Sequence, residues 1–152
     1  MAFDETTVGR GQDVVLSFGT KGAEAALNTN GYIKSVDWPE DTADLDASGT
    51  GAYEHSKAGQ AKVVEITIEA ICTSGAAGAA NPVASFIAAK RTEGKGLVYG
   101  PAGSATGMPK RHFDTNDGSC YVKSISYKSD PKGVVTATIK LRTTGSWTDT
   151  VY

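Results

Sequence analysis

The chain has 152 residues, a formal net charge of −2 and 18 glycines, while aromatic residues make up 8%. This length suits one domain with one hydrophobic core, and the glycine content favours a β-rich fold with many turns. The charge argues against a basic nucleic-acid-binding surface, and no apolar run approaches the ~20 residues of a membrane span. The polar start of the chain is not typical of a secretory signal, so we expect a single domain, 1–152, made in the cytoplasm.

The first forty residues predict an arm and two short strands. Residues 1–11 are polar and predict an N-terminal arm, and residues 12–18 alternate as a strand does. Asn30-Gly31 is typical of a tight hairpin turn, and a second strand is expected at 32–38. The small residues between 19 and 27 predict a loose connection.

An acidic stretch without periodicity follows at 39–59. Loops of this length are uncommon inside a compact domain and usually serve binding. Two interpretations stay open, an exposed surface loop and a segment that orders against another subunit. The candidate contact residues are Glu40, Asp41, Asp44, Asp46, Tyr53 and His55. A partial calcium-loop pattern begins at Asp44, but His55 stands where the loop needs glutamate, so we expect no metal.

The middle of the chain predicts one long strand and one helix. Residues 60–72 alternate between apolar and polar side chains, which predicts a strand with one buried face. Asn81 can cap a helix and Pro82 suits its first position, which predicts a helix over 82–92 that ends at Gly94. We expect Val83, Phe86 and Ile87 to pack on the sheet. Cys72 and Cys120 are expected to be free thiols.

The segment 120–145 predicts the central hairpin of the sheet. Val135, Ala137, Ile139 and Leu141 alternate with polar residues, so they should share the buried face. The preceding strand alternates too, and the turn 129–133 contains Pro131 and Gly133, of which the glycine can adopt a positive φ. The last residues, 146–152, are expected to extend beyond the sheet as a C-terminal arm.

The sequence contains no specific catalytic constellation. His55 and His112 are outside any metal-binding spacing, and neither a nucleophile elbow nor a phosphate-binding loop is present. Glu65 and Glu69 are four residues apart on one predicted strand, about 13 Å, which is wider than a glycosidase pair. We therefore predict a protein that is not an enzyme and has no cofactor.

The order of these elements resembles the major tail tube proteins of long-tailed bacteriophages and the related tube proteins of contractile tails and type VI secretion. The residues that carry the resemblance are the acidic loop after Asp37-Trp38, the stretch 54–60 leading into 63–70, the helix 82–92 and the ending 134–145. It implies an antiparallel β-sandwich or barrel with one flanking helix and a long loop. Six subunits would join into a ring around a lumen, and rings would stack into a tube.

The resemblance also implies roles for particular residues. Polar strand faces would line the lumen, and mixed acids and bases there would let DNA pass without gripping phosphate. The lumen candidates are Glu65, Thr67, Glu69, Thr136, Thr138, Lys140 and Arg142, and Trp147 and Tyr152 are candidates for docking on a neighbouring subunit. The acidic loop is expected to dock on the next ring, at Lys110-Arg111 or Lys90-Arg91.

The implied partners are other copies of the chain, a tape measure protein, a tail terminator and distal tail or baseplate proteins. DNA would be bound only in transit and no membrane would be involved, so the expected location is the virion tail, assembled in the host cytoplasm. The alternatives are a capsid decoration protein, which would form trimers, and a carbohydrate-binding β-sandwich, which needs a row of exposed aromatic residues that the sequence does not show.

Overall fold

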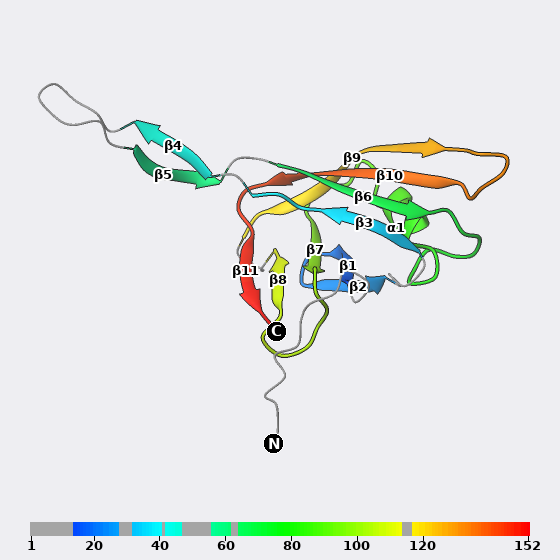
Figure 1. The fold of residues 1–152 in the computed structure, drawn as a ribbon, viewed down its shortest axis with the longest axis horizontal. Coiled ribbons are helices and arrows are strands. Elements are labelled where there is room, and N and C mark those ends of the chain that lie inside the picture. Colours follow the sequence, from blue (N-terminus) through cyan, green and yellow to red (C-terminus); the bar gives the residue numbers. More distant parts are fainter. Residues whose placement is uncertain (1–13, 28–31, 41, 47–55, 62–63, 114–116) are drawn as a thin grey trace, which may run out of the picture.

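A computed structural model describes residues 14–27, 32–40, 42–46, 56–61, 64–113 and 117–152. Within these residues the chain is mainly β, with one nine-stranded antiparallel sheet, one separate two-stranded hairpin and one short helix (Figure 1). The sheet contains β1 (Val15–Thr20), β2 (Ala23–Leu27), β3 (Ile33–Asp37), β6 (Glu65–Ile71), β7 (Lys95–Gly100), β8 (Pro109–His112), β9 (Ser119–Lys128), β10 (Thr136–Thr144) and β11 (Thr148–Val151).

The sheet bends sharply between β7 and β9. Strands β9, β10, β6 and β3 form one half, and β2, β1, β7, β8 and β11 form the other. A single residue pair, Lys95 with Cys120, joins the two halves. The predicted antiparallel β architecture with one flanking helix is therefore confirmed, and in the described part of the chain the sheet does not close into a barrel.

One hydrophobic core lies between the two halves and the helix. The inward residues of β6 and β10 have no exposed surface, as the alternation predicted. On the other side, Phe18 of β1 meets Phe86 of the helix with ring centroids 4.5 Å apart. Burial of this apolar surface, at about 25 cal/mol per Å², is the main force that holds the bent sheet together. The most deeply buried core residues are Leu16, Phe86, Ile66, Ile68, Leu97, Ile139, Leu141 and Cys120.

The predicted central hairpin is present as β9 and β10. Its turn is fixed by Asp130, whose carbonyl accepts from the Gly133 N–H at 3.0 Å and whose side chain accepts from the Lys132 N–H at 3.0 Å. Gly133 does not use a positive φ, so the aspartate rather than the glycine sets the turn.

A β-bulge interrupts β9 at Lys123, where the register with β10 shifts between Lys140 and Leu141. Because a bulge adds one residue, the inward positions change phase along the strand. Val122 is buried before the bulge, and Ile125 packs against the core after it. The two cysteines are free, and burial raises the pKa of the Cys120 thiol to about 12.

The predictions for the first forty residues were only partly right. The loose connection expected at 19–27 is instead strand β2, which pairs with β1 across the two-residue turn Lys21-Gly22. Strand β3 pairs with β6 rather than with β1, so the expected N-terminal hairpin is wrong. Asn30-Gly31 and the arm 1–11 are outside the described residues.

The helix α1 (Pro82–Ala88) begins as predicted but ends earlier. The Asn81 side chain accepts from the Ala84 N–H at 3.2 Å, which confirms the cap. Arg91 has a φ of 65°, a left-handed conformation that does not continue a helix, so Gly94 lies beyond the end. Val83 and Phe86 are buried, whereas Ile87 is 45% exposed and does not pack on the sheet as expected.

The stretch expected to be a long aperiodic loop contains two strands. β4 (Thr42–Asp46) and β5 (Ser56–Ala61) pair antiparallel with each other and form a sheet of their own. Figure 1 shows this β4–β5 hairpin extending away from the nine-stranded sheet. The strand predicted at 60–72 is correspondingly divided, because β5 ends at Ala61 and β6 begins at Glu65.

Candidate assembly surfaces

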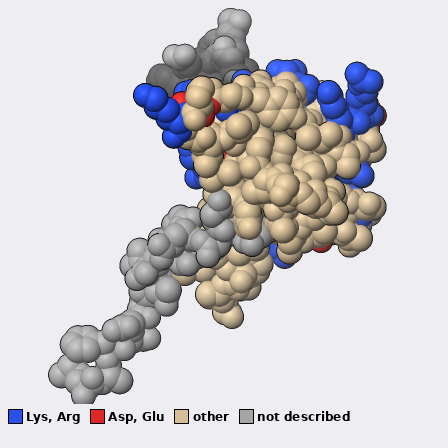
Figure 2. All heavy atoms as spheres, turned by 90° about the vertical axis from the view of Figure 1, so that its right-hand side faces the viewer, with Lys and Arg blue, Asp and Glu red and all other residues tan. Residues whose placement is uncertain are grey.

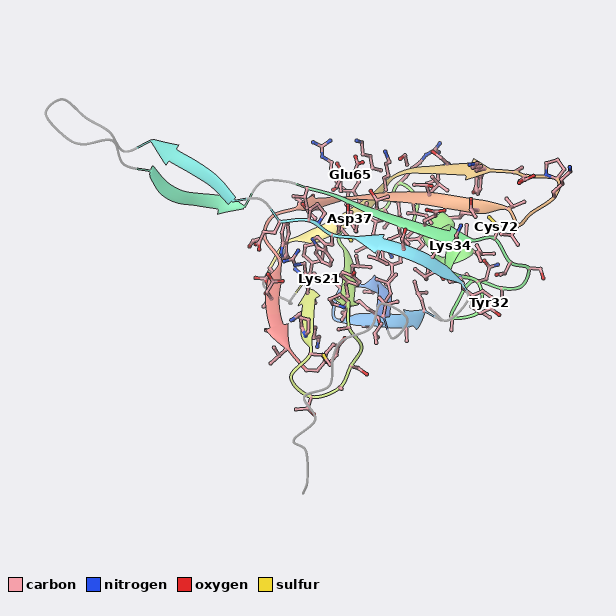
Figure 3. All side chains as sticks on the ribbon, viewed as in Figure 1. Lys21, Tyr32, Lys34, Asp37, Glu65 and Cys72 are labelled. Carbon is pink, nitrogen blue, oxygen red and sulfur yellow. The ribbon has the colours of Figure 1, made fainter. Side chains whose placement is uncertain are left out.

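The outer face of β9, β10, β6 and β3 collects the seven predicted lumen residues. Opposite residues in an antiparallel pair share a face, and the register places Arg142 opposite Glu65, Lys140 opposite Thr67 and Thr138 opposite Glu69. Thr136 continues the same row opposite Ile71. This surface is called the polar face below, and Figure 3 shows its side chains standing above the ribbon around Glu65.

Ion pairs across strands partly neutralise the polar face. Glu65 pairs with Lys123 of β9 at 2.7 Å and with Lys140 at 3.4 Å, and Lys34 of β3 pairs with Glu69 at 3.4 Å. The hydrogen bond from Lys123 is the main cause that lowers the pKa of the Glu65 carboxyl. Exposed pairs of this kind contribute little to stability but balance the surface charge.

Sequence reasoning missed the residues that β3 and β9 add to the polar face. Asp37 lies opposite Thr67, and Lys128 lies opposite Thr136. With Lys34 and Lys123 included, the face carries five basic and three acidic side chains. Alternation alone could not find these residues, because a bulge interrupts both strands.

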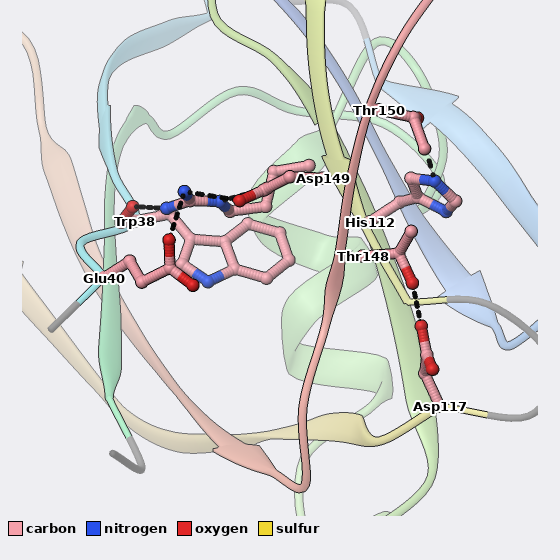
Figure 4. A network of polar contacts seen from close by, with 8 residues as sticks. Trp38, Glu40, His112, Asp117, Thr148, Asp149 and Thr150 are labelled. Carbon is pink, nitrogen blue, oxygen red and sulfur yellow. Dashed lines mark hydrogen bonds and ion pairs between the residues drawn. The ribbon is translucent and has the colours of Figure 1, made fainter. Parts of the chain in front are cut away.

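A second surface lies at the base of the β4–β5 hairpin, where Arg111 of β8 holds the residues that precede β4. The guanidinium donates to the Trp38 carbonyl at 2.6 Å and reaches the Glu40 carboxylate at 3.5 Å. It also donates twice to Asp149 of β11, at 2.7 and 3.0 Å (Figure 4). The hydrogen bond to Asp149 raises the pKa of Arg111, so the guanidinium stays charged.

Two tryptophans enclose this arginine. The guanidinium carbon is 6.0 Å from the Trp38 ring and 5.5 Å from the Trp147 ring, within cation–π range. The centroids of the two indole rings are 5.7 Å apart in an edge-on arrangement. The Trp38 ring also packs against the Phe113 ring in a tilted arrangement. Among the described residues neither buried indole N–H has an acceptor. We call Arg111 with Trp38, Glu40, Trp147 and Asp149 the arginine clamp.

The C-terminal residues are part of the subunit itself. β11 pairs with β8, and Trp147 packs against the core, so the expectation that 146–152 extend beyond the sheet is wrong. Tyr152 lies under the Lys110 ammonium at 5.1 Å, and its backbone pairs with Met108. The docking role of Trp147 and Tyr152 remains a prediction, but most of Trp147 is not available for it.

The other predicted contact residues fall into three groups. Glu40 binds its own chain's Arg111, which leaves Arg111 engaged and unsuitable as the receptor for a neighbour's acidic loop. Asp44 and Asp46 belong to β4, while Asp41, Tyr53 and His55 lie outside the described residues. Other polar contacts near the clamp, His112 with Thr150 at 3.3 Å and Thr148 with Asp117, tie β11 to its neighbours.

In the described part of the chain no group of three or more His, Cys, Asp or Glu could hold a metal ion. A depression of about 380 Å³ beside the clamp is lined by Trp38, Tyr99, Pro101, Arg111 and neighbouring residues of β8 and β11. Within the same described residues, no helix has the length and apolar character needed to cross a membrane.

Solved structures with a similar fold are found among tail and injection-system proteins. The sheath/tube terminator of the PVC extracellular contractile injection system superposes with a TM-score of 0.69 at 11% identity, covering 98% of this chain and all of that one. The tail of an empty gene transfer agent particle gives 0.61 at 11% identity, covering 95% and 100%. The SPP1 tail tube gives 0.59 at 14% identity, covering 95% and 80%.

The chain has the tail-tube fold. The match extends over nearly the whole of this chain, so it includes the bent sheet and is not a local motif. No protein-family model and no curated protein matches the sequence. The similarity is therefore one of three-dimensional structure. The sequence identities are too low for residues of these proteins to be matched one by one.

Proposed function

We propose that this protein is a structural subunit of a tail tube, which self-assembles into stacked, hexameric rings whose lumen conducts DNA. The observation that carries the proposal is the tail-tube fold combined with a hairpin that extends from it. A two-stranded hairpin is marginally stable in water, so a hairpin paired only with itself is expected to order against another molecule. In this proposal that molecule is another copy of the chain.

The free edges of the sheet support ring formation. β3 and β2 are edge strands within the described sheet, and β9 pairs with β7 through one residue pair only. Unpaired strand edges invite pairing with another chain, and identical subunits can close a ring by head-to-tail contact. The gene transfer agent tail was solved with six-fold symmetry, which supports a hexameric ring here.

The polar face supports the lumen. It is rich in serine and threonine, and Glu65 and Glu69 are both paired with lysines. A lumen that passes DNA must not retain phosphate, and acids placed among the bases weaken that attraction. The tube would work in the virion tail together with a tape measure protein, a terminator and distal tail or baseplate proteins.

A tube terminator is the second candidate, because the PVC sheath/tube terminator and the anti-feeding prophage cap share the fold across nearly their whole length. A terminator would form one ring on the end of a tube and would not stack on itself. The two functions therefore predict different products from the purified protein.

Negative-stain microscopy of the purified protein tests both functions. Hollow filaments built of stacked rings support the tube subunit, and single rings support the terminator. A variant in which a short Gly-Ser linker replaces residues 42–61 should remain folded but form no filaments. Compact monomers of the unaltered protein at all concentrations, or filaments of normal length from the variant, contradict the tube proposal.

A further inference from the structure

The charges of the polar face are segregated by strand. β9 and β10 contain no aspartate or glutamate, and all of their charged residues are basic. β6 contains two glutamates and no base, and β3 adds one residue of each sign. The excess of positive charge on the polar face is therefore concentrated on two neighbouring strands. The basic side chains of these two strands are called the basic stripe, and they are Lys123, Lys128, Lys140 and Arg142.

The register places the basic stripe on the outer side of the sheet. Lys140 and Arg142 alternate with buried residues of β10, and Lys128 lies opposite Thr136. Lys123 is the extra residue of the bulge, and its ammonium bonds to a carboxylate of the polar face. Figure 2 shows lysine and arginine side chains along the upper margin of the molecule, where this face lies. The stripe therefore presents its cations together on one exposed surface.

Among the described residues, a single acid forms ion pairs with the basic stripe. Glu65 lies opposite Arg142 in the register, but its two carboxylate oxygens pair with Lys123 at 2.7 Å and Lys140 at 3.4 Å. Arg142 and Lys128 are both exposed, and within the described chain neither forms an ion pair. Cations this close on one surface repel each other, and a bound polyanion would remove that repulsion.

Hydroxyl groups occupy positions beside the cations. Ser124 lies opposite Lys140, and Ser126 lies opposite Thr138. Lysine, arginine, serine and threonine side chains are typical contacts to phosphate and sugar in protein–DNA complexes. Double-stranded DNA carries one negative charge per about 1.7 Å, whereas an extended peptide presents at most one per ~3.4 Å. Closely spaced cations among hydroxyls therefore favour a DNA backbone over an acidic protein segment.

We propose that the basic stripe binds the phosphate backbone of double-stranded DNA, weakly and without sequence preference. This inference rests on the proposed tube function for its setting and deepens it, because it names the side chains of the lumen that contact DNA. Acids and bases mixed evenly would give a surface of little net attraction, but the strand order leaves the attraction on β9 and β10. The carboxylates of β6 and β3 limit the affinity, so that DNA is guided without being retained.

The first test measures DNA binding by the full chain, kept as single subunits as judged by sedimentation velocity. Fluorescence anisotropy of a short labelled duplex gives the affinity at several salt concentrations. The stripe variant carries Lys128→Gln and Arg142→Gln, which removes two cations without breaking an ion pair of the described residues. The matched control carries Lys90→Gln and Arg91→Gln, which removes the same charge from exposed residues that follow α1, off the polar face. Circular dichroism establishes that each variant is folded.

The salt dependence of binding gives the expected result. If the unaltered chain neutralises about three phosphates, its affinity should fall about 40-fold between about 50 and 200 mM salt. The stripe variant should bind at least about tenfold more weakly at low salt, and its salt slope should fall by about one for each cation removed. The control variant should keep both the affinity and the slope of the unaltered chain.

A second pair of variants tests the acid that limits the stripe. Glu65→Gln frees both lysines from their ion pairs, so it should strengthen DNA binding several-fold. Glu93→Gln makes the same change of charge at an exposed residue after α1 and should leave binding unchanged. An equal gain from both variants would show that net charge rather than the stripe attracts DNA, which overturns the inference.

Other outcomes separate the inference from the tube function. A stripe variant that binds DNA like the unaltered chain, or a control that loses as much, overturns the inference. Displacement of the DNA by polyglutamate at equal charge concentration also overturns it, because the stripe would then be a site for an acidic protein. Filaments from a chain whose subunits do not bind DNA overturn the inference and leave the tube function standing. DNA binding through the stripe by a chain that forms neither rings nor filaments contradicts the tube function instead.

Discussion

Two of the hairpins in the described chain, β9–β10 and β4–β5, have opposite surroundings. β9 and β10 lie inside the nine-stranded sheet, where β6 pairs with the other edge of β10 and the inward residues have no exposed surface. β4 and β5 pair only with each other in the described chain. The first hairpin is stabilised by burial within its own subunit, whereas the second pairs with no other strand among the described residues, and a two-stranded hairpin alone is marginally stable in water. Under the proposed tube function, one hairpin serves folding and the other serves assembly.

Hydrogen exchange should show the largest difference between the two hairpins. In the isolated subunit, β10 amides should exchange only through global unfolding, while β4 and β5 amides exchange through local opening, about 10³-fold or more faster. Exchange measured by mass spectrometry before and after assembly gives the test. Protection of β4 and β5 should rise on assembly, and equal protection in the isolated subunit would remove the distinction.

The two hairpins should differ in how much they contribute to the free energy of unfolding. Leu141→Ala on β10 removes a fully buried side chain and should lower the free energy of unfolding by about 2–5 kcal/mol. Replacing residues 42–61 with the short Gly-Ser linker should change that free energy far less. Urea denaturation of the subunit measures both. A linker variant as unstable as Leu141→Ala would show that the β4–β5 hairpin belongs to the core.

The arginine clamp ties the residues that precede β4 to strands β8 and β11 of the large sheet, so its loss should have an intermediate effect. Arg111→Ala removes the bond to the Trp38 carbonyl, the pair with Asp149 and the contact with two indoles, and should cost about 1–3 kcal/mol. Arg111→Lys should recover only part of this, because an ammonium cannot make the two-point contact with Asp149. Lys128→Ala removes an exposed lysine that forms no ion pair among the described residues, and it serves as the control in thermal unfolding.

The smallest effect concerns the polar face. The pKa of Glu65 is lowered in the folded state, mainly by Lys123, so its ionised form favours folding. This contribution is present above the carboxyl's unfolded pKa and is lost as pH falls through the lowered folded value. Glu65→Gln should therefore reduce the acid dependence of stability slightly and leave neutral stability almost unchanged. A carboxyl that titrates at its ordinary pKa in an NMR experiment would contradict the pairing.

The sequence by itself determined the elements whose signals are local. Alternation located β10 and β6 and their buried faces, and Asn81-Pro82 located the start of α1. It did not locate β2 or the β4–β5 hairpin, because these strands are rich in alanine, glycine and aspartate, which have low strand propensity. It also placed β3 with the wrong partner, since pairing between distant strands is set by the whole sheet.

The tertiary structure alone decided the sites. Register brought Glu65, Lys123 and Lys140 onto one face from three strands, and a bulge displaced the alternation that would have revealed Lys123. Folding also placed Arg111 beside Trp38 and Asp149, which are 73 and 38 residues away in sequence. Local patterns report which side of an element is buried because the backbone repeat is local. Which elements meet depends on how the apolar faces of the whole chain can be covered at once, and only the folded chain contains that information.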